Sequence, residues 1–127
     1  MRYALLLHSH EPTPGEIPPE GLEEMERLFD EYGKALQAAG VLVGADIMQF
    51  SHATTTLTRR SGSTQVQDGP FAETKEALAG VFIIEVPDAD AALAWAEKCQ
   101  GASYGSIEIR PVATSLAGGT WTAHGPA

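Results

Sequence analysis

The residues PEGLEEMERLFDEYGKALQAAG, from Pro19 to Gly40, predict a long amphipathic helix. Their apolar members recur at alternating spacings of three and four, which places them on one face. The stripe consists of Leu22, Met25, Phe29, Tyr32, Leu36 and Ala39. Proline suits the first turn of a helix, and the glutamates that follow suit the positive end of its dipole. Gly40 supplies the left-handed residue that ends the helix. Such a stripe requires a surface to cover, which the rest of the chain must provide.

Short apolar runs on both sides of this helix predict strands. The run Arg2 to His8 precedes it and leads into a loop with four prolines between Ser9 and Pro19. Further strand-like segments follow at 41–50, 54–59, 64–67, 80–86 and 106–112. Asp88 can cap a second helix that runs to Gln100. This order favours an α+β fold, an antiparallel sheet covered on one face by two helices. It suits a ferredoxin-like βαββαβ protomer with an extra hairpin.

Strand parity divides the predicted sheet into two faces, because successive side chains point to opposite sides. The face toward the helices is expected to hold Tyr3, Leu5, Leu7, Phe82, Ile84, Val86, Ile107 and Ile109. The opposite face is expected to hold Arg2, Ala4, Leu6, His8, Val81, Ile83, Glu85, Ser106, Glu108 and Arg110. The opposite face mixes apolar groups with charges, and an apolar patch in water usually marks a partner. We therefore expect a homodimer in which two sheets pack together.

The composition limits the classes of partner. The 127 residues contain eight Lys and Arg against 17 Asp and Glu, a formal charge of −9, and no basic stripe. This argues against nucleic acid and against an anionic membrane surface, and leaves a small organic molecule as the expected ligand. Cys99 is the only cysteine, which excludes an intrachain disulfide and fits a reducing cytoplasm. No apolar run is long enough to cross a membrane. We expect one domain at residues 1–113 and a loosely held tail at 114–127.

The segment from Asp68 to Glu76 reads DGPFAETKE and is followed by Leu78, Gly80, Phe82 and Glu85. With the residues Tyr104 to Pro111, YGSIEIRP, it resembles the DGPF branch of the YCII-related family. The resemblance covers nearly the whole chain to Val112. It implies a dimeric α+β barrel of ferredoxin-like protomers, with a cleft between sheet and loops and a largely unassigned role. Some members are similar to small lyases or dehydrochlorinases, and others accompany extracytoplasmic-function sigma factors.

One feature of the enzymatic relatives is missing. In the enzymatic relatives that this chain resembles, a histidine on the first helix is paired with an aspartate. The matching position falls near Phe29, and no histidine occurs between Pro19 and Gly40. Acid–base groups must therefore come from elsewhere in the chain.

The DGPFAETKE segment offers one set of such groups. Asp68 followed by Gly-Pro is typical of a turn, since Asp can bond backbone amides two residues on. Three further titratable groups crowd beside it: Glu73, Lys75 and Glu76. If Lys75 pairs with Asp68 or Glu76, one carboxylate stays ionised while the other can carry a proton. Charges solvated at the start of an element would give the same pattern.

Other candidates lie on the strands. His8 and His10 share one side of an extended strand, and Glu11 or His52 can complete a metal site, although strand-end histidines are more common. Arg110 and Glu108 share a face with Glu85 and His8, where they either form ion pairs or grip a carboxylate or enolate. Three further side chains either line a pocket or belong to the core: Met48, Phe50 and Trp121. Cys99 lies on the apolar face of the second helix with Ala92 and Trp95, which favours packing over nucleophilic catalysis.

These residues lead to two functional hypotheses. The first is a cofactor-independent lyase or isomerase that uses general acid–base chemistry on a small aromatic or carbonyl compound. Its catalytic groups are Asp68, Glu76 and His8, with no metal. Its substrate-binding groups are Phe71, Glu73, Lys75, Glu85 and Arg110. The second is a non-catalytic ligand-binding module or a regulatory partner in sigma-factor signalling.

Overall fold

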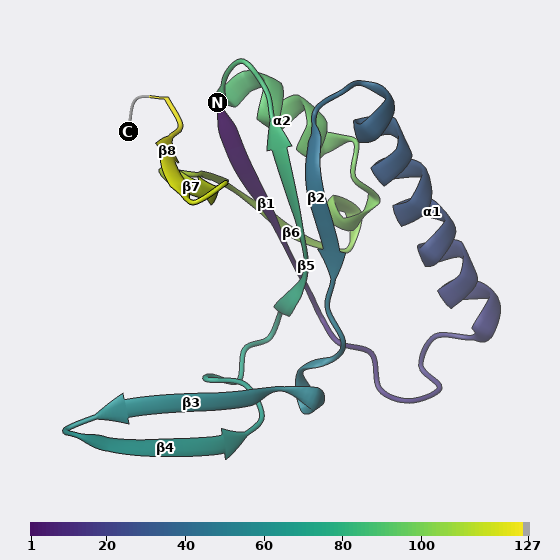
Figure 1. The fold of residues 1–127 in the computed structure, drawn as a ribbon. Helices are drawn as coiled ribbons and strands as arrows, with labels where there is room; N and C mark the ends of the chain where they lie inside the picture. The colour runs from purple at the N-terminus through teal and green to yellow at the C-terminus, as the bar shows by residue number, and fades with distance from the viewer. Residues whose placement is uncertain (126–127) are drawn as a thin grey trace.

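The computed structural model describes residues 1–125, so the end of the predicted tail, Pro126 and Ala127, lies outside the described residues (Figure 1). The elements in chain order are β1 (Arg2–Ser9), α1 (Pro19–Ala38), β2 (Leu42–Ile47), η1 (Ser51–Ala53), β3 (Thr55–Arg60), β4 (Ser63–Asp68), β5 (Ala77–Glu85), α2 (Ala89–Glu97), η2 (Gln100–Ser103), β6 (Gly105–Pro111), β7 (Thr114–Ala117) and β8 (Thr120–Ala123). The predicted α+β fold with two α-helices and antiparallel sheet is confirmed.

The main sheet has four strands in the order β2-β5-β1-β6, and every neighbouring pair is antiparallel. Leu5 lies opposite Phe82 on one side and Ile109 on the other, so it occupies the centre of the sheet. The backbones of β1 and β6 approach closely at Gly105, where an added Cβ would lie 2.2 Å from the carbonyl oxygen of His8. Only glycine fits there, and it allows β6 to pair with β1 from Tyr3 to Ser9.

Both helices cover the same face of the sheet. The core joins sheet residues to residues of both helices, and its buried members are Tyr3, Leu5, Leu7, Tyr32, Leu36, Phe82, Ile84, Val86, Ala92, Ala96 and Cys99. Six of the eight sheet positions predicted from parity are buried, and the other two, Ile107 and Ile109, pack partly buried against the core. The predicted helix-facing side of the sheet is therefore correct.

The helix ends follow the predicted signals. The first helix begins with Pro19 in its first turn and ends two residues before Gly40. The second begins after Asp88, whose Oδ1 accepts a hydrogen bond from the amide of Ala91 at 2.9 Å. It ends at Glu97, earlier than predicted, so Cys99 lies just beyond the helix and is still buried. No helix in residues 1–125 is long and apolar enough to cross a membrane.

Two hairpins lie outside the main sheet. The strands β3 and β4 pair only with each other, and Figure 1 shows them projecting from one end of the sheet, on the side opposite α1. The strands β7 and β8 form the other hairpin, in the segment that has no apolar periodicity. Hydrogen bonds within a sequence-local hairpin do not require such periodicity. How tightly the tail is held stays a prediction.

Candidate functional site

An apolar cavity of about 420 Å³ lies at the end of the main sheet, beside the first turns of α1. It is bounded by the β1–α1 loop, the segment that follows β2, the start of β5 and the η2 region. Its apolar walls include Met25, Phe29, Ile47, Met48, Phe50 and Leu78. The polar side chains that line it are His8, Ser9, His10, Glu11, Glu16, Gln49 and Tyr104, and His8 is the one predicted catalytic residue among them. A mainly apolar cavity with a few polar groups is the usual form of a small-molecule site.

A contact between two loops forms one edge of this cavity. Glu11, in the β1–α1 loop, accepts a hydrogen bond from the amide of Ser51 on its Oε2 at 2.6 Å. Its Oε1 accepts a second bond from the Ser51 hydroxyl. The carboxylate therefore ties the loop before α1 to the segment that carries Met48 and Phe50. Charge-assisted bonds of this kind are stronger than bonds between neutral groups, so the two walls are held together.

A histidine and a carboxylate also meet at this cavity. Nε2 of His10 lies 3.9 Å from Oε1 of Glu16. The Thr13 amide and hydroxyl both donate to the same Glu16 oxygen, at 3.0 and 3.2 Å. These bonds, the backbone one first, lower the pKa of Glu16, and the nearby His10 adds to the effect. Glu16 is therefore held as a carboxylate next to an imidazole.

The sequence between these two residues explains why they meet. Thr13-Pro14-Gly15-Glu16 closes a turn, in which the Glu16 amide donates to the Thr13 carbonyl at 3.0 Å and Gly15 has a φ of 83°. Proline followed by a residue with positive φ is typical of a type II turn. His10 was predicted only as a metal ligand, and Glu16 was not among the predicted site residues. The Thr-Pro-Gly-Glu turn was the signal that could have brought them together.

The DGPF segment closes the base of the β3–β4 hairpin. Asp68 is the last residue of β4, and the Gly69 amide donates to the Thr54 carbonyl at 2.7 Å. The Thr56 hydroxyl donates to the Gly69 carbonyl at 2.8 Å. These bonds join Gly69 to the start of the hairpin, and neither involves the Asp68 side chain, so its role in a turn stays a prediction.

The same segment lines an open groove. Asp68, Phe71 and Glu73 are exposed, and all three border this groove. The groove shares Glu11, Met48, Phe50 and Leu78 with the apolar cavity. The segment is therefore next to the cavity, and whether it contacts a ligand stays a prediction.

The remaining predicted site residues do not gather around Asp68. Lys75 forms no ion pair in residues 1–125, so the proposed pairing with Asp68 or Glu76 is absent there. Glu76 accepts a hydrogen bond from the Ser106 hydroxyl at 3.1 Å instead. The backbone bends near Thr74 and Glu76, so charged residues that are neighbours in sequence do not have to lie close together in space. A cluster of charges in the sequence does not show this. Neither Lys75 nor Glu76 lines the cavity or the groove.

The open face of the sheet holds the predicted charged residues as ion pairs. Nε2 of His8 lies 2.8 Å from Oε1 of Glu108, although the ring N–H is not aligned for a hydrogen bond. Glu85 lies 2.9 Å from the Met1 ammonium and 3.6 Å from Nε of Arg2. A hydrogen bond from that ammonium is the main cause that lowers the pKa of Glu85. These pairs agree with the structural alternative for this face.

The remaining candidates differ in where the structure places them. Arg110 is exposed, opposite Ala4 in the sheet. Within the described residues, no group of three or more His, Cys, Asp or Glu is arranged to hold a metal ion. Trp121 is exposed on β8 and lines neither the cavity nor the groove, whereas Met48 and Phe50 line both. Cys99 is buried, and burial raises the pKa of its thiol.

Comparison with known proteins supports the resemblance seen in the sequence. The family model of the YCII-related domain matches residues 1–115. A protein of Rhizobium meliloti (strain 1021), described as uncharacterized, is 36% identical over 115 residues. The match covers 89% of this chain and 93% of that relative. The chain therefore belongs to the YCII-related domain family.

Proposed function

We propose that this protein is a cofactor-independent enzyme of the lyase or isomerase type, acting on a small aromatic or carbonyl compound in the apolar cavity. The observation that supports the proposal is the His10–Glu16 pair at a cavity whose walls are mainly apolar. Apolar walls bind the body of such a substrate, and the polar groups at the edge act on its acidic proton. The pair supplies the histidine that α1 lacks, next to a carboxylate.

His10 is assigned the role of general base. An imidazole is the commonest general base in enzymes, and it can accept a proton from substrate and return it to product. Glu16 stabilises the imidazolium that forms, since a carboxylate favours the charged form of a neighbouring base. Tyr104 lines the same cavity, and burial raises the pKa of its phenol. A phenol that keeps its proton can donate a hydrogen bond to the developing enolate oxygen.

Binding is tested first, by a thermal-shift screen of small aromatic and carbonyl compounds. The filled variant Met25→Trp should lose the stabilisation that hits give to the parent. Glu23→Trp adds the same ring on an exposed part of α1 and should keep that stabilisation. Hits that stabilise all three proteins equally would place binding outside the cavity and contradict the proposal.

Turnover of the hits is tested second. His10→Gln should lower kcat by about 100-fold or more, the usual contribution of a general base, while KM changes less than about threefold. Glu16→Gln should lower kcat by a smaller factor, because it acts through His10. Equal turnover in His10→Gln and the parent would remove His10 from the chemistry. Binding without any turnover would favour the second candidate, a ligand-binding or regulatory module.

We also propose that the protomer is ferredoxin-like and forms a homodimer through the open face of its sheet. Leu6, Val81 and Ile83 are half-buried on that face, between the charged pairs His8–Glu108 and Arg2–Glu85. A second sheet would cover the apolar groups and leave the charges at the rim, as protein interfaces usually do. The exposed apolar residues of the β3–β4 hairpin favour a protein partner as well, and a sigma-factor-related partner is the alternative to a second copy.

A further inference from the structure

The β3–β4 hairpin stands apart from the body of the protein. Its strands pair with each other and with no strand of the main sheet. Each strand has six residues, which gives the hairpin a length of about 20 Å. A two-stranded hairpin is only marginally stable in water unless another surface supports it. The main sheet offers this hairpin no strand partner, so a further surface would stabilise it.

One face of the hairpin is apolar at its centre. Leu57 lies directly opposite Val66, and their exposed fractions are 61% and 63%. The pair is flanked by Arg59 opposite Thr64 and by Thr55 opposite Asp68. The other face is polar, with Thr58 opposite Gln65 between further Thr, Gln, Arg and Ser residues. An apolar centre with a polar and charged border is the composition of a contact surface.

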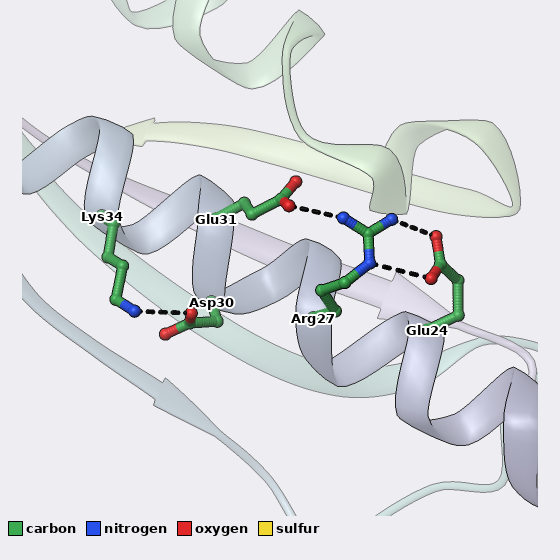
Figure 2. A network of polar contacts seen from close by, with 5 residues as sticks. All are labelled: Glu24, Arg27, Asp30, Glu31 and Lys34. Carbon is green, nitrogen blue, oxygen red and sulfur yellow. Dashed lines mark hydrogen bonds and ion pairs between the residues drawn. The ribbon is translucent and has the colours of Figure 1, made fainter.

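The hairpin is also the basic part of an acidic molecule. It carries Arg59 and Arg60, two of the eight basic residues, and one of the 17 acidic residues. On α1, Figure 2 shows Arg27 between Glu24 and Glu31, and Lys34 on Asp30. The bases of α1 are thus already paired with its own acids, and exposed carboxylates such as Glu20, Glu23 and Glu26 remain. Charge complementarity therefore favours contact between the hairpin of one copy and the acidic surface of another.

We propose that the β3–β4 hairpin is a dimerisation arm that packs against a second copy of this chain. It buries the Leu57–Val66 face against the partner and places Arg59, at the border of that face, among the partner's carboxylates. The hairpin projects from one end of the sheet, on the side away from α1 (Figure 1). Twofold symmetry makes the contact reciprocal, because each copy gives and receives one arm. The proposal rests on the proposed homodimer and not on the enzymatic activity.

Sedimentation equilibrium from about 1 to 100 μM tests the arm. The parent should be a dimer, and the double variant Leu57→Thr with Val66→Thr should weaken the dimer at least about tenfold, or 1.4 kcal/mol. Threonine keeps the strand propensity while removing apolar surface. The control, Thr58→Ser with Gln65→Thr, changes the opposite face of the same strands and should dimerise within about twofold of the parent.

A further substitution protects the test against simple unfolding of the hairpin. Arg59→Glu keeps the apolar pair and should also weaken the dimer, because the border of the buried face then repels the partner's carboxylates. Added salt should narrow the difference between this variant and the parent. Hydrogen exchange of the β3–β4 amides should be slow in the concentrated parent and should accelerate when the dimer dissociates on dilution.

Three results would overturn the proposal. The first is a parent that stays monomeric at 100 μM, which would also remove the homodimer. The second is a double variant at Leu57 and Val66 that dimerises as well as its control, which would leave the open face as an interface without the arm. The third is slow exchange of the hairpin amides in a monomer, which would place the hairpin on its own body. The thermal shift caused by a ligand, measured on the same variants, tests binding in the cavity independently of these three results.

Discussion

Removal of the Tyr32 hydroxyl tests how the two helices are joined over the sheet. Tyr32 is on α1, is 5% exposed, and donates a hydrogen bond to the backbone carbonyl of Trp95 on α2 at 2.7 Å. Burial raises the pKa of Tyr32, so its phenol remains a donor. Tyr32→Phe keeps the ring and its edge contact with Phe82, whose centroid lies 5.2 Å away. The substitution therefore isolates one hydrogen bond between the helices.

The expected cost is about 1 kcal/mol of unfolding free energy, the usual net value of one hydrogen bond. A larger cost is not expected, because the Trp95 carbonyl also accepts a bond from the Lys98 amide at 3.1 Å and keeps one partner. Unfolding entropies of about 2 cal/mol/K per residue give roughly 270 cal/mol/K for a chain of this length. The melting temperature should therefore fall by about 4 °C.

Urea denaturation followed by circular dichroism measures this cost, and the slope m should not change. Tyr3→Phe is the matched control, since Tyr3 is 2% exposed and its hydroxyl donates only to the sulfur of Met1, at 3.7 Å. Sulfur is a weak acceptor, so the control should lose less than about 0.5 kcal/mol. Equal losses in the two variants would refute the hydrogen bond as a link between α1 and α2.

Three further predictions concern separate parts of the fold. Leu36→Ala, at a fully buried position of α1, should cost about 2–5 kcal/mol in urea denaturation, and a loss below about 1 kcal/mol would contradict the burial of this face. Cys99 should react with a thiol reagent at pH 8 only as fast as the protein opens, because burial raises the pKa of the thiol; rapid reaction in the native protein would show an accessible thiol. Asp68→Asn should keep the unfolding free energy within about 1 kcal/mol, since asparagine fits the same turn, and a tenfold loss of ligand affinity would assign the carboxylate to the site.

The core could be predicted from the sequence because it depends on periodicity alone. Alternation in the first strand fixed Tyr3, Leu5 and Leu7 as the covered side, and the helical stripe selected Tyr32 and Leu36. The stripe was less informative toward the start of α1, where Leu22 is 44% exposed beside the cavity. An apolar stripe indicates a face that meets something, and it does not distinguish a sheet from a ligand cavity.

The pairing of strands could not be read in the same way. Residues 54–59 and 64–67 were predicted as strands, and the structure has strands at Thr55–Arg60 and Ser63–Asp68. Strand propensity does not show whether such a hairpin joins the main sheet. Whether β3 and β4 can pair with the main sheet depends on the path of the chain after Ile47 and before Ala77. That path is fixed by contacts between residues distant in sequence, such as Glu11 with Ser51.

The candidate site depends even more on such contacts. The crowding of charges from Asp68 to Glu76 suggested a cluster, yet a turn residue and its neighbours can point in different directions. His10 and Glu16 are separated by five residues of loop and meet because a turn brings them back. Pro14 and Gly15 favour this turn, and both residues can be recognised in the sequence. The sequence does not show which side chains the turn brings together.

The most direct test of the proposed site is amide chemical-shift mapping by NMR while the parent is titrated with a hit from the thermal-shift screen. The cavity site predicts saturable shifts in the segments that bound it, residues 8–11, 16–29, 47–50, 78–79 and 101–104. His10 should show one of the larger changes, because its imidazole faces the reacting part of the bound molecule. Shifts confined to the β7–β8 hairpin or the open sheet face, with the cavity segments unchanged, would contradict the account.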